Sequence, residues 1–157
     1  FPDMNIVGIE IRKPLAEDLS REIATRGLRN AYVHWGNIAE ALPEFFPPQR
    51  VARAYALFPD PWFKRRHEKR RLLAGDFLDR LAPILAPGAE FHLASDQPTL
   101  AEWMRKRLEA RADFANLAGE GNYAPGRTVP FPTEWEAHAE TAGRPVRWMR
   151  FRKVDGD

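Results

Sequence analysis

One stretch of the sequence, residues 57–71, joins a constrained carboxylate to a dense group of positive charges. Asp60 stands between two prolines, Pro59 and Pro61, and follows an apolar run that is typical of a buried strand. An acid at the C-terminal end of a strand lies where open α/β sheets bind their ligands. The prolines restrict the backbone on both sides of Asp60, so its position is fixed at low entropic cost.

The positive charges form a basic octad, Lys64 to Arg71, with six Lys or Arg, one His and one Glu. Such a cluster attracts phosphate. Trp62, just before it, offers a rigid aromatic face on which a base can stack. For the octad alone, a solvated surface and a nucleic-acid contact are both open interpretations. Its position beside Asp60 favours chemistry on a polyanion, most simply a nucleic acid.

Alternating strands and helices are expected to position these residues. Strands are predicted at residues 5–10, 31–35, 51–58, 90–94 and 146–151. Helices are predicted at residues 14–26, 38–42, 77–86 (kinked by Pro83) and 98–110, and after Thr133, which forms a capping box with Glu136. This alternation predicts an α/β fold with a mostly parallel sheet and helices on both faces.

Polar side chains stand at the C-terminal ends of four of these strands, at Glu10, Asn37, Asp60 and Asp96. We expect them to line one edge of the sheet. Glu10 suits hydrogen bonds from ribose hydroxyls, but the residue by itself favours a solvated charge at a strand end. Asn37 can bind an adenine edge or only form a turn. Asp96 can contact a ligand, cap the next helix, or do both.

Composition limits the class of protein. The 157 residues suit one domain, residues 1–157, and the formal charge of +2 means that the positive charge is local. The absence of cysteine excludes disulfides and fits a reducing cytosol, so we expect a cytoplasmic protein. No apolar run approaches the ~20 residues of a membrane span. The histidines show no ligand spacing, so we predict no metal site.

The central stretch closely resembles the signature of the bacterial tRNA (guanine-N7-)-methyltransferases. These enzymes methylate guanine 46 in the variable loop of tRNA with S-adenosylmethionine. The resemblance rests first on Phe58-Pro59-Asp60-Pro61-Trp62, followed by Lys64 and residues 66–71. Supporting segments extend over nearly the whole chain, at residues 6–10, 93–96, 133–136 and 143–152.

The resemblance implies a Rossmann-like methyltransferase fold and a role for each matching residue. Asp60 would be the catalytic acid, and Glu10, Asn37 and Asp60 would hold S-adenosylmethionine. The substrate contacts would be Lys64, Asp96, Thr133, Glu134, Trp135 and Glu136. The tRNA contacts would be Arg66, His67, Glu68, Lys69, Arg70 and Arg71. The sequence departs from the family pattern at Asn37 (usually Asp), at Glu134 (usually basic) and in the negative charge of Glu68.

The family's first strand and Gly-rich cofactor loop have no counterpart in these residues. We therefore expect an N-terminally truncated domain, with a gap in its sheet between residues 5–10 and 51–58 and with half of a cofactor pocket. For the oligomeric state we expect a monomer or a weak homodimer.

Two other classes of protein remain open. A catalytically inactive relative would keep the basic octad as an RNA-binding module, an alternative that the departures at Asn37 and Glu134 favour. A small-molecule α/β enzyme, such as a nucleotide-dependent dehydrogenase, would use Glu10 for ribose. That class would leave the octad without a role, and the sequence has no Gly-rich dinucleotide loop to support it.

Overall fold

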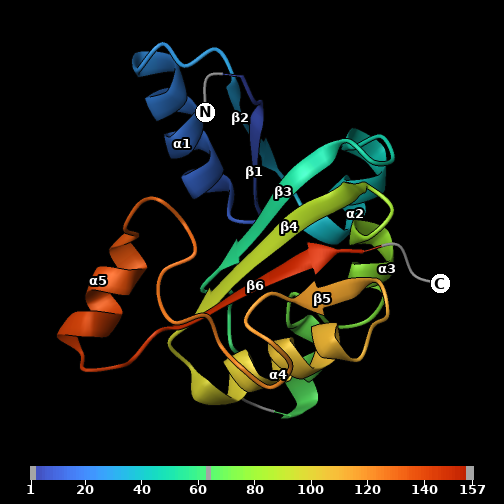
Figure 1. Cartoon of the computed structure of the whole chain (residues 1–157). Helices are drawn as coiled ribbons and strands as arrows, with labels where there is room; N and C mark the ends of the chain where they lie inside the picture. The colour runs from blue at the N-terminus through green and yellow to red at the C-terminus, as the bar shows by residue number, and fades with distance from the viewer. Residues whose placement is uncertain (1–2, 63–64, 155–157) are drawn as a thin grey trace. The chain divides into compact units, whose positions relative to one another are not determined.

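The structure of the chain, a computed structural model, describes residues 3–62 and 65–154 (Figure 1). Lys64, expected to contact substrate, lies outside the described residues. The chain forms two compact units, residues 1–47 and 48–157. The single domain expected from the sequence therefore remains a prediction. In the described part of the chain, every helix is too short or too polar to cross a membrane.

The first unit is a two-stranded parallel sheet with two helices. Its elements are β1 (Ile6–Glu10), α1 (Lys13–Thr25), β2 (Ala31–Trp35) and α2 (Ile38–Phe45). Glu10 is paired with Trp35 at the ends of the two strands, and the Gly36 amide donates a hydrogen bond of 3.0 Å to the Glu10 carbonyl. Because β1 and β2 run in the same direction, the residues that follow them leave the sheet at one edge.

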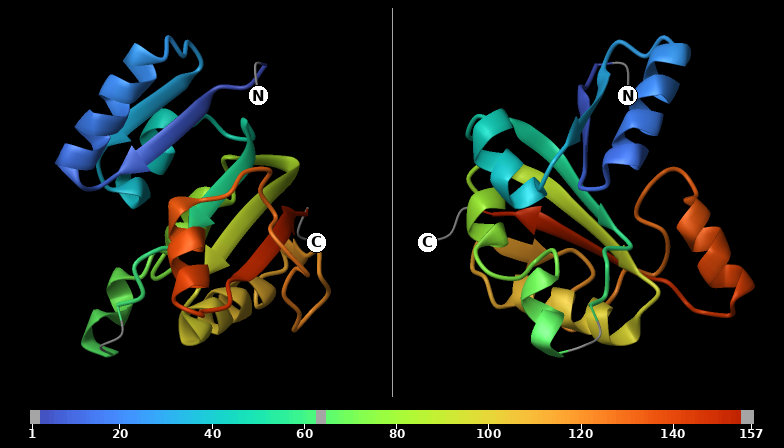
Figure 2. Two further views of the ribbon diagram at one scale, coloured as in Figure 1. Left: turned by 90° about the vertical axis from the view of Figure 1, so that its left-hand side faces the viewer. Right: turned by 180° about the vertical axis from the view of Figure 1, so that it is seen from behind.

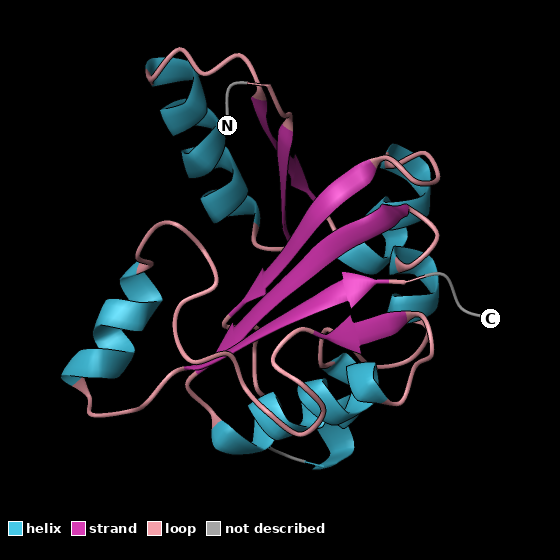
Figure 3. Ribbon diagram, viewed as in Figure 1, coloured by secondary structure: helices cyan, strands magenta, loops and turns pink. Residues whose placement is uncertain are grey.

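The second unit contains a four-stranded sheet in the order β3-β4-β6-β5 (Figure 3). Its elements are β3 (Val51–Leu57), the 3₁₀ helix η1 (Arg65–Arg70), α3 (Phe77–Leu81), β4 (Leu85–Ser95), α4 (Pro98–Glu109), β5 (Phe114–Asn116), α5 (Glu134–Thr141) and β6 (Arg147–Lys153). β3 and β4 are parallel, whereas β6 is antiparallel to both β4 and β5. The α/β class is confirmed, and this sheet is mixed where the sequence predicted mostly parallel pairing.

A compact core lies where α4 packs on this sheet. α4 buries Leu100, Met104 and Leu108, which recur every four residues and so share one helix face. The sheet contributes fully buried side chains from its central strands, including Leu93 of β4 and Phe151 of β6. This core fixes the central strands whose ends carry the candidate site.

Local structure differs from the sequence-based expectation around Pro83. The helix predicted for residues 77–86 ends at Leu81, and β4 already begins at Leu85. The proline lacks an amide hydrogen and its ring clashes with the preceding turn, which accounts for the early end. Pro87 and Gly88 lie inside β4, where the pairing with β3 shifts register.

Truncating Leu93 tests the core. We expect Leu93→Ala to lower the free energy of unfolding by about 3 kcal/mol, because the fully buried side chain leaves a cavity. The matched control is Leu117→Ala at a 38% exposed side chain, for which we expect a change within about 0.5 kcal/mol. Urea unfolding followed by circular dichroism measures both, and equal effects would contradict the assigned core.

Candidate functional site

The loop after β3 is strained on both sides of Asp60. Phe58 has φ of 54° and Trp62 has φ of 42°, so both lie in the left-handed region. Bulky residues rarely adopt this conformation, and each instance costs of order 1–3 kcal/mol. Such strain persists only where the surrounding structure holds it, and it is most common at functional sites.

Three contacts hold this strained loop, with Ala94, Trp148 and Arg71. The Phe58 amide donates a hydrogen bond of 2.8 Å to the Ala94 carbonyl, and the Phe58 ring meets the Trp148 ring edge-on at 6.2 Å. On the other side of Asp60, the Pro61 carbonyl accepts a hydrogen bond of 3.1 Å from Arg71 Nε. Both ends of the loop are therefore fixed, while Asp60 itself is exposed.

Asp96 follows β4 at the same edge of the sheet, because Leu57 of β3 pairs with Ala94 of β4 in a parallel register. Unlike Asp60, Asp96 is only 4% exposed. Its Oδ2 accepts hydrogen bonds from Arg144 Nε at 2.7 Å and from Gln97 Nε2 at 3.2 Å. Gln97, not Asp96, is the N-cap of α4, so the helix-cap alternative for Asp96 is wrong.

The described side chains of the basic octad, those of residues 66–71, divide into an outward and an inward group. Arg66, Lys69 and Arg70 of η1 are exposed. The Arg70 guanidinium lies 5.2 Å from the centre of the Trp62 ring, and the His67 ring meets the same indole at 5.7 Å. These contacts join the outward side chains to the strained loop that carries Asp60.

Arg71 points inward, with a side chain that is 14% exposed. Besides the Pro61 carbonyl, it binds Glu68 Oε1 through Nη1 at 3.2 Å and lies 5.1 Å from the centre of the Trp103 ring. Glu68, expected as an RNA contact, is therefore the ion-pair partner of Arg71. Trp103 was not among the predicted site residues, since its contact with Arg71 joins distant parts of the chain and leaves no local sequence pattern.

The segment 133–136 builds the start of α5. Thr133 Oγ1 accepts a hydrogen bond from the Glu136 amide at 3.1 Å, and the Glu136 side chain accepts one from the Thr133 amide, which completes the predicted capping box. Glu136 is 5% exposed and pairs with Arg127. Glu134 and Trp135 are exposed, so a substrate can reach them, and Thr133 is half-buried.

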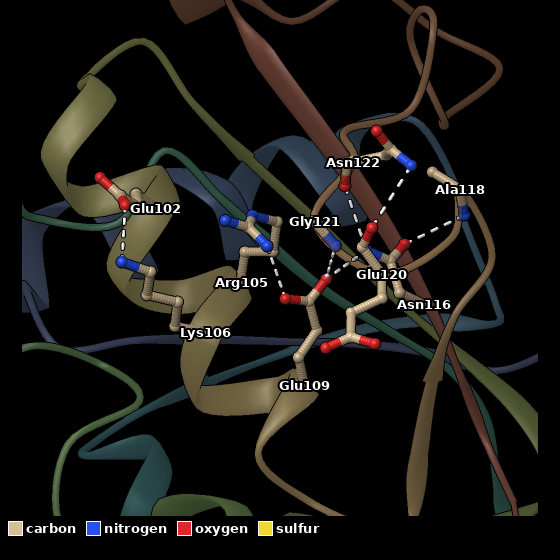
Figure 4. Close-up of polar contacts among 9 residues, drawn as sticks. All are labelled: Glu102, Arg105, Lys106, Glu109, Asn116, Ala118, Glu120, Gly121 and Asn122. Carbon is tan, nitrogen blue, oxygen red and sulfur yellow. Dashed lines mark hydrogen bonds and ion pairs between the residues drawn. The ribbon is translucent and has the colours of Figure 1, made fainter.

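A network around Glu109 anchors the long connection between β5 and α5 (Figure 4). Glu109 accepts hydrogen bonds from Arg105 of its own helix, from the Asn116 side chain and from the Gly121 amide, at 2.5, 2.8 and 2.8 Å. Further along the connection, Val129 is buried against Ala94 and Trp148, with Leu57 and Phe58 packed around them. The connection is therefore fixed beside the ends of β3 and β4.

Glu10 and Asn37 lie together at one edge of the first unit. Glu10 Oε1 accepts hydrogen bonds from the amide and Nε of Arg12, at 2.7 and 3.2 Å. Burial acts to raise the pKa of Glu10, but these bonds together with the charge of Arg12 hold the pKa below its ordinary value. The Glu10 side chain is 27% exposed, so ribose hydroxyls can reach its carboxylate.

Asn37 acts as the N-cap of α2. Its Oδ1 accepts a hydrogen bond from the Ala39 amide at 3.1 Å, and its Nδ2 donates one to Glu40 Oε1 at 3.3 Å. The side-chain amide is thus used within its own helix start. The contact expected between Asn37 and a cofactor remains a prediction. Among the described residues, no group of acidic and histidine side chains could hold a metal ion.

Comparison of the sequence with known proteins gives a family match and close relatives. The model of a family described as "Putative methyltransferase" matches residues 1–149. A protein of Hydrogenovibrio crunogenus is 33% identical over 153 residues, and one of Pseudomonas putida is 32% identical over 154 residues. Both are named tRNA (guanine-N(7)-)-methyltransferase. Each alignment covers 98% of this chain, which spans only 64% of the length of either relative.

Comparison of the fold with solved structures also finds methyltransferases. A crystal structure of an S-adenosylmethionine-dependent O-methyltransferase from Thermotoga maritima superposes with a TM-score of 0.59 at 15% sequence identity. The match covers 98% of this chain and 51% of that one. At this identity the match describes the fold alone. It confirms the Rossmann-like methyltransferase fold expected from the sequence.

Removing Arg71 tests the inward half of the octad. We expect Arg71→Ala to speed hydrogen exchange at the Phe58 amide, because the loop loses its bond to the Pro61 carbonyl and its packing on Trp103. The expected loss of local stability is about 1–3 kcal/mol. Arg66→Ala, at an exposed position of the same run, is the control and leaves this exchange rate unchanged. Equal rates in both variants would contradict the anchoring role.

Proposed function

The chain belongs to the methyltransferase family whose model it matches over residues 1–149, and from this premise we propose that it methylates N7 of guanine in tRNA. The observation that carries the proposal is the strained loop around Asp60, which contacts the outward basic face of η1. The two relatives named tRNA (guanine-N(7)-)-methyltransferase support the choice of substrate. We propose guanine 46 of the variable loop as the target.

The proposed cofactor is S-adenosylmethionine, which supplies, when bound, an electrophilic methyl group on a sulfonium centre. Guanine N7 carries a lone pair and no proton at neutral pH, so the attack needs no strong general base. The tasks of the protein are then to position the guanine and to stabilise charge. Methylation makes the base cationic, and the Asp60 carboxylate favours that developing positive charge.

Asp96 is proposed to recognise the guanine. Arg144 and Gln97 occupy its Oδ2, whereas Oδ1 has no hydrogen-bond partner among the described residues. Oδ1 is therefore suited to accept a hydrogen bond from guanine N1–H or from the exocyclic amine. Adenine lacks that pattern of donors, so this contact would discriminate between the two purines.

The remaining side chains are proposed to bind the cofactor and the RNA. Glu10 would accept hydrogen bonds from the ribose of the cofactor through its partly exposed carboxylate. The outward side chains of η1 would contact phosphates of the tRNA. Lys64, Glu134 and Trp135 are kept as proposed substrate contacts, and a cytoplasmic location is proposed because it is where tRNA substrates are found. The oligomeric state, a monomer or a weak homodimer, remains a prediction.

A non-catalytic RNA-binding relative is the second candidate. The use of the Asn37 side chain as a helix cap favours it, because Asn37 stands at a position expected to hold the cofactor. The test is methyl transfer from S-adenosylmethionine to unmodified tRNA by the full gene product, read as 7-methylguanosine by mass spectrometry. Product at guanine 46 supports the enzyme, whereas tRNA binding without any product supports the second candidate.

Replacing Asp60 separates catalysis from binding. We expect Asp60→Asn to lower kcat by roughly 10²–10³-fold, because the charge that stabilises the cationic product is lost. The affinity for tRNA should change little, since Asp60 carries no positive charge for phosphate. Single-turnover methyl transfer and filter binding measure the two effects, with the exposed Asp18→Asn on α1 as the control. A loss of affinity as large as the loss of rate would contradict the assignment.

Replacing Glu10 tests the cofactor contact. We expect Glu10→Gln to weaken S-adenosylmethionine binding by roughly tenfold or more, because hydrogen bonds to a charged acceptor are replaced by neutral ones. The exposed Glu17→Gln on α1 is the control. Isothermal titration calorimetry measures both dissociation constants, and equal values in the two variants would remove Glu10 from the site.

The pH dependence of cofactor binding follows from the pKa of Glu10. Because this pKa is below its ordinary value in the folded protein, the carboxylate keeps its charge to a lower pH than an ordinary glutamate does. We therefore expect the Glu10 contribution to binding to persist at pH 5 and to be lost only as the pH falls through the lowered pKa. Calorimetry across this range checks it, and a loss already complete at pH 5 would contradict it.

A further inference from the structure

Two ion pairs in the second unit share an unusual arrangement. Arg127 Nε donates to both carboxylate oxygens of Glu136, at 3.0 and 2.9 Å, and Arg144 Nε donates to Asp96 Oδ2 at 2.7 Å. The carboxylates are almost fully buried, with 7% and 4% of their side chains exposed. The arginine side chains are 38% and 42% exposed. Each arginine is therefore held at its inner edge and open to solvent at its outer edge.

The outer edge of each guanidinium has hydrogen-bond donors to spare. Among the described residues, neither Nη1 nor Nη2 of Arg127 or of Arg144 donates a hydrogen bond. Arg150 shows the contrasting case, because both its Nε and its Nη2 bind Glu90 and so leave a smaller free edge. Two parallel donors of a guanidinium match two oxygens of a phosphate.

Both arginines flank α5 and lie near the edge that carries Asp60 and Asp96. Arg127 is two residues before Val129, which is buried against Ala94 and Trp148. Arg144 follows the end of α5, and its amide donates a hydrogen bond of 2.8 Å to the Ala139 carbonyl. Figure 1 and the right view of Figure 2 both show α5 beyond the ends toward which β3 and β4 run.

Burial of the partner carboxylates makes these guanidiniums rigid. An exposed arginine loses side-chain freedom when it binds a phosphate, and this loss weakens the contact. Arg127 and Arg144 have already lost that freedom, since each inner edge is fixed by a carboxylate that cannot remain buried without a partner. Each ion pair has no net charge, so binding would come from directed hydrogen bonds more than from long-range attraction.

We propose that Arg127 and Arg144 form a second phosphate-binding surface, here called the α5 arginine pair, which contacts the RNA backbone beside the target guanine. This inference rests on the proposed function. η1 and the α5 arginine pair would then bind the backbone at different positions around the reacting base. The inner edges of the same two arginines would keep Asp96 and Glu136 in place.

Replacing each arginine with lysine separates the role of the inner edge, the buried ion pair, from the role of the outer edge, the free hydrogen-bond donors. In Arg127→Lys and Arg144→Lys the ammonium group still pairs with the buried carboxylate, but the outer fork of donors is lost. We expect roughly tenfold weaker binding of unmodified tRNA for each variant and a melting temperature within a few degrees of the wild type. The matched control is Arg80→Lys, whose Nε also binds a carboxylate, at 2.9 Å, but on α3.

Chemical footprinting of the wild-type gene product gives a second measurement that needs no variant to fold. Phenylglyoxal modification with and without tRNA, read by mass spectrometry, should show protection of Arg127 and Arg144 but not of Arg80. Unchanged tRNA affinity in folded lysine variants, or equal modification with and without tRNA, would overturn the inference while methyl transfer by the wild type stands. A wild type that neither binds nor methylates tRNA would overturn the proposed function as well.

Discussion

The parallel pairing of β3 with β4 is the constraint on which the candidate site of the second unit depends. Leu57 lies opposite Ala94, and the Phe58 amide continues the pairing with a hydrogen bond of 2.8 Å to the Ala94 carbonyl. Because the two strands end in register, Asp60 and Asp96 leave the sheet at the same edge. The hydrogen bond also fixes the first strained residue of the loop, so the arrangement of Asp60 depends on it directly.

Two carboxylates near this edge differ sharply in environment, and the difference follows from their partners. Asp60 is exposed and needs no compensation for lost hydration. Asp96 is buried, and a buried carboxylate without a partner is strongly destabilising. Arg144 supplies that partner from a segment 48 positions further along the chain. The same reasoning applies to Glu136 and Arg127, so the arginines around α5 stabilise the fold at the point where they border the site.

The elements and contacts that depend on neighbouring residues alone could be predicted from the sequence. The capping box of Thr133 and Glu136 is a pattern within four residues, and it is present in the structure. Asn37, left open between a ligand contact and a turn, caps α2. The pairing of Arg144 with Asp96 and the packing of Arg71 on Trp103 depend on which distant segments the fold brings together. The three-residue strand β5 is likewise too short to show a period of two.

The basic octad shows why positive charge alone does not identify a nucleic-acid contact. Arg70 and Arg71 are adjacent and chemically identical, yet Arg70 lies outward over Trp62 while Arg71 binds the Pro61 carbonyl and Glu68. Glu68, a negative charge in a run expected to contact RNA, pairs with Arg71 at 3.2 Å while its own side chain is 44% exposed. The sequence departure at Glu68 is explained by this pairing, which stabilises η1 beside the strained loop. A guanidinium is available to a phosphate only through the donors that the fold has left free.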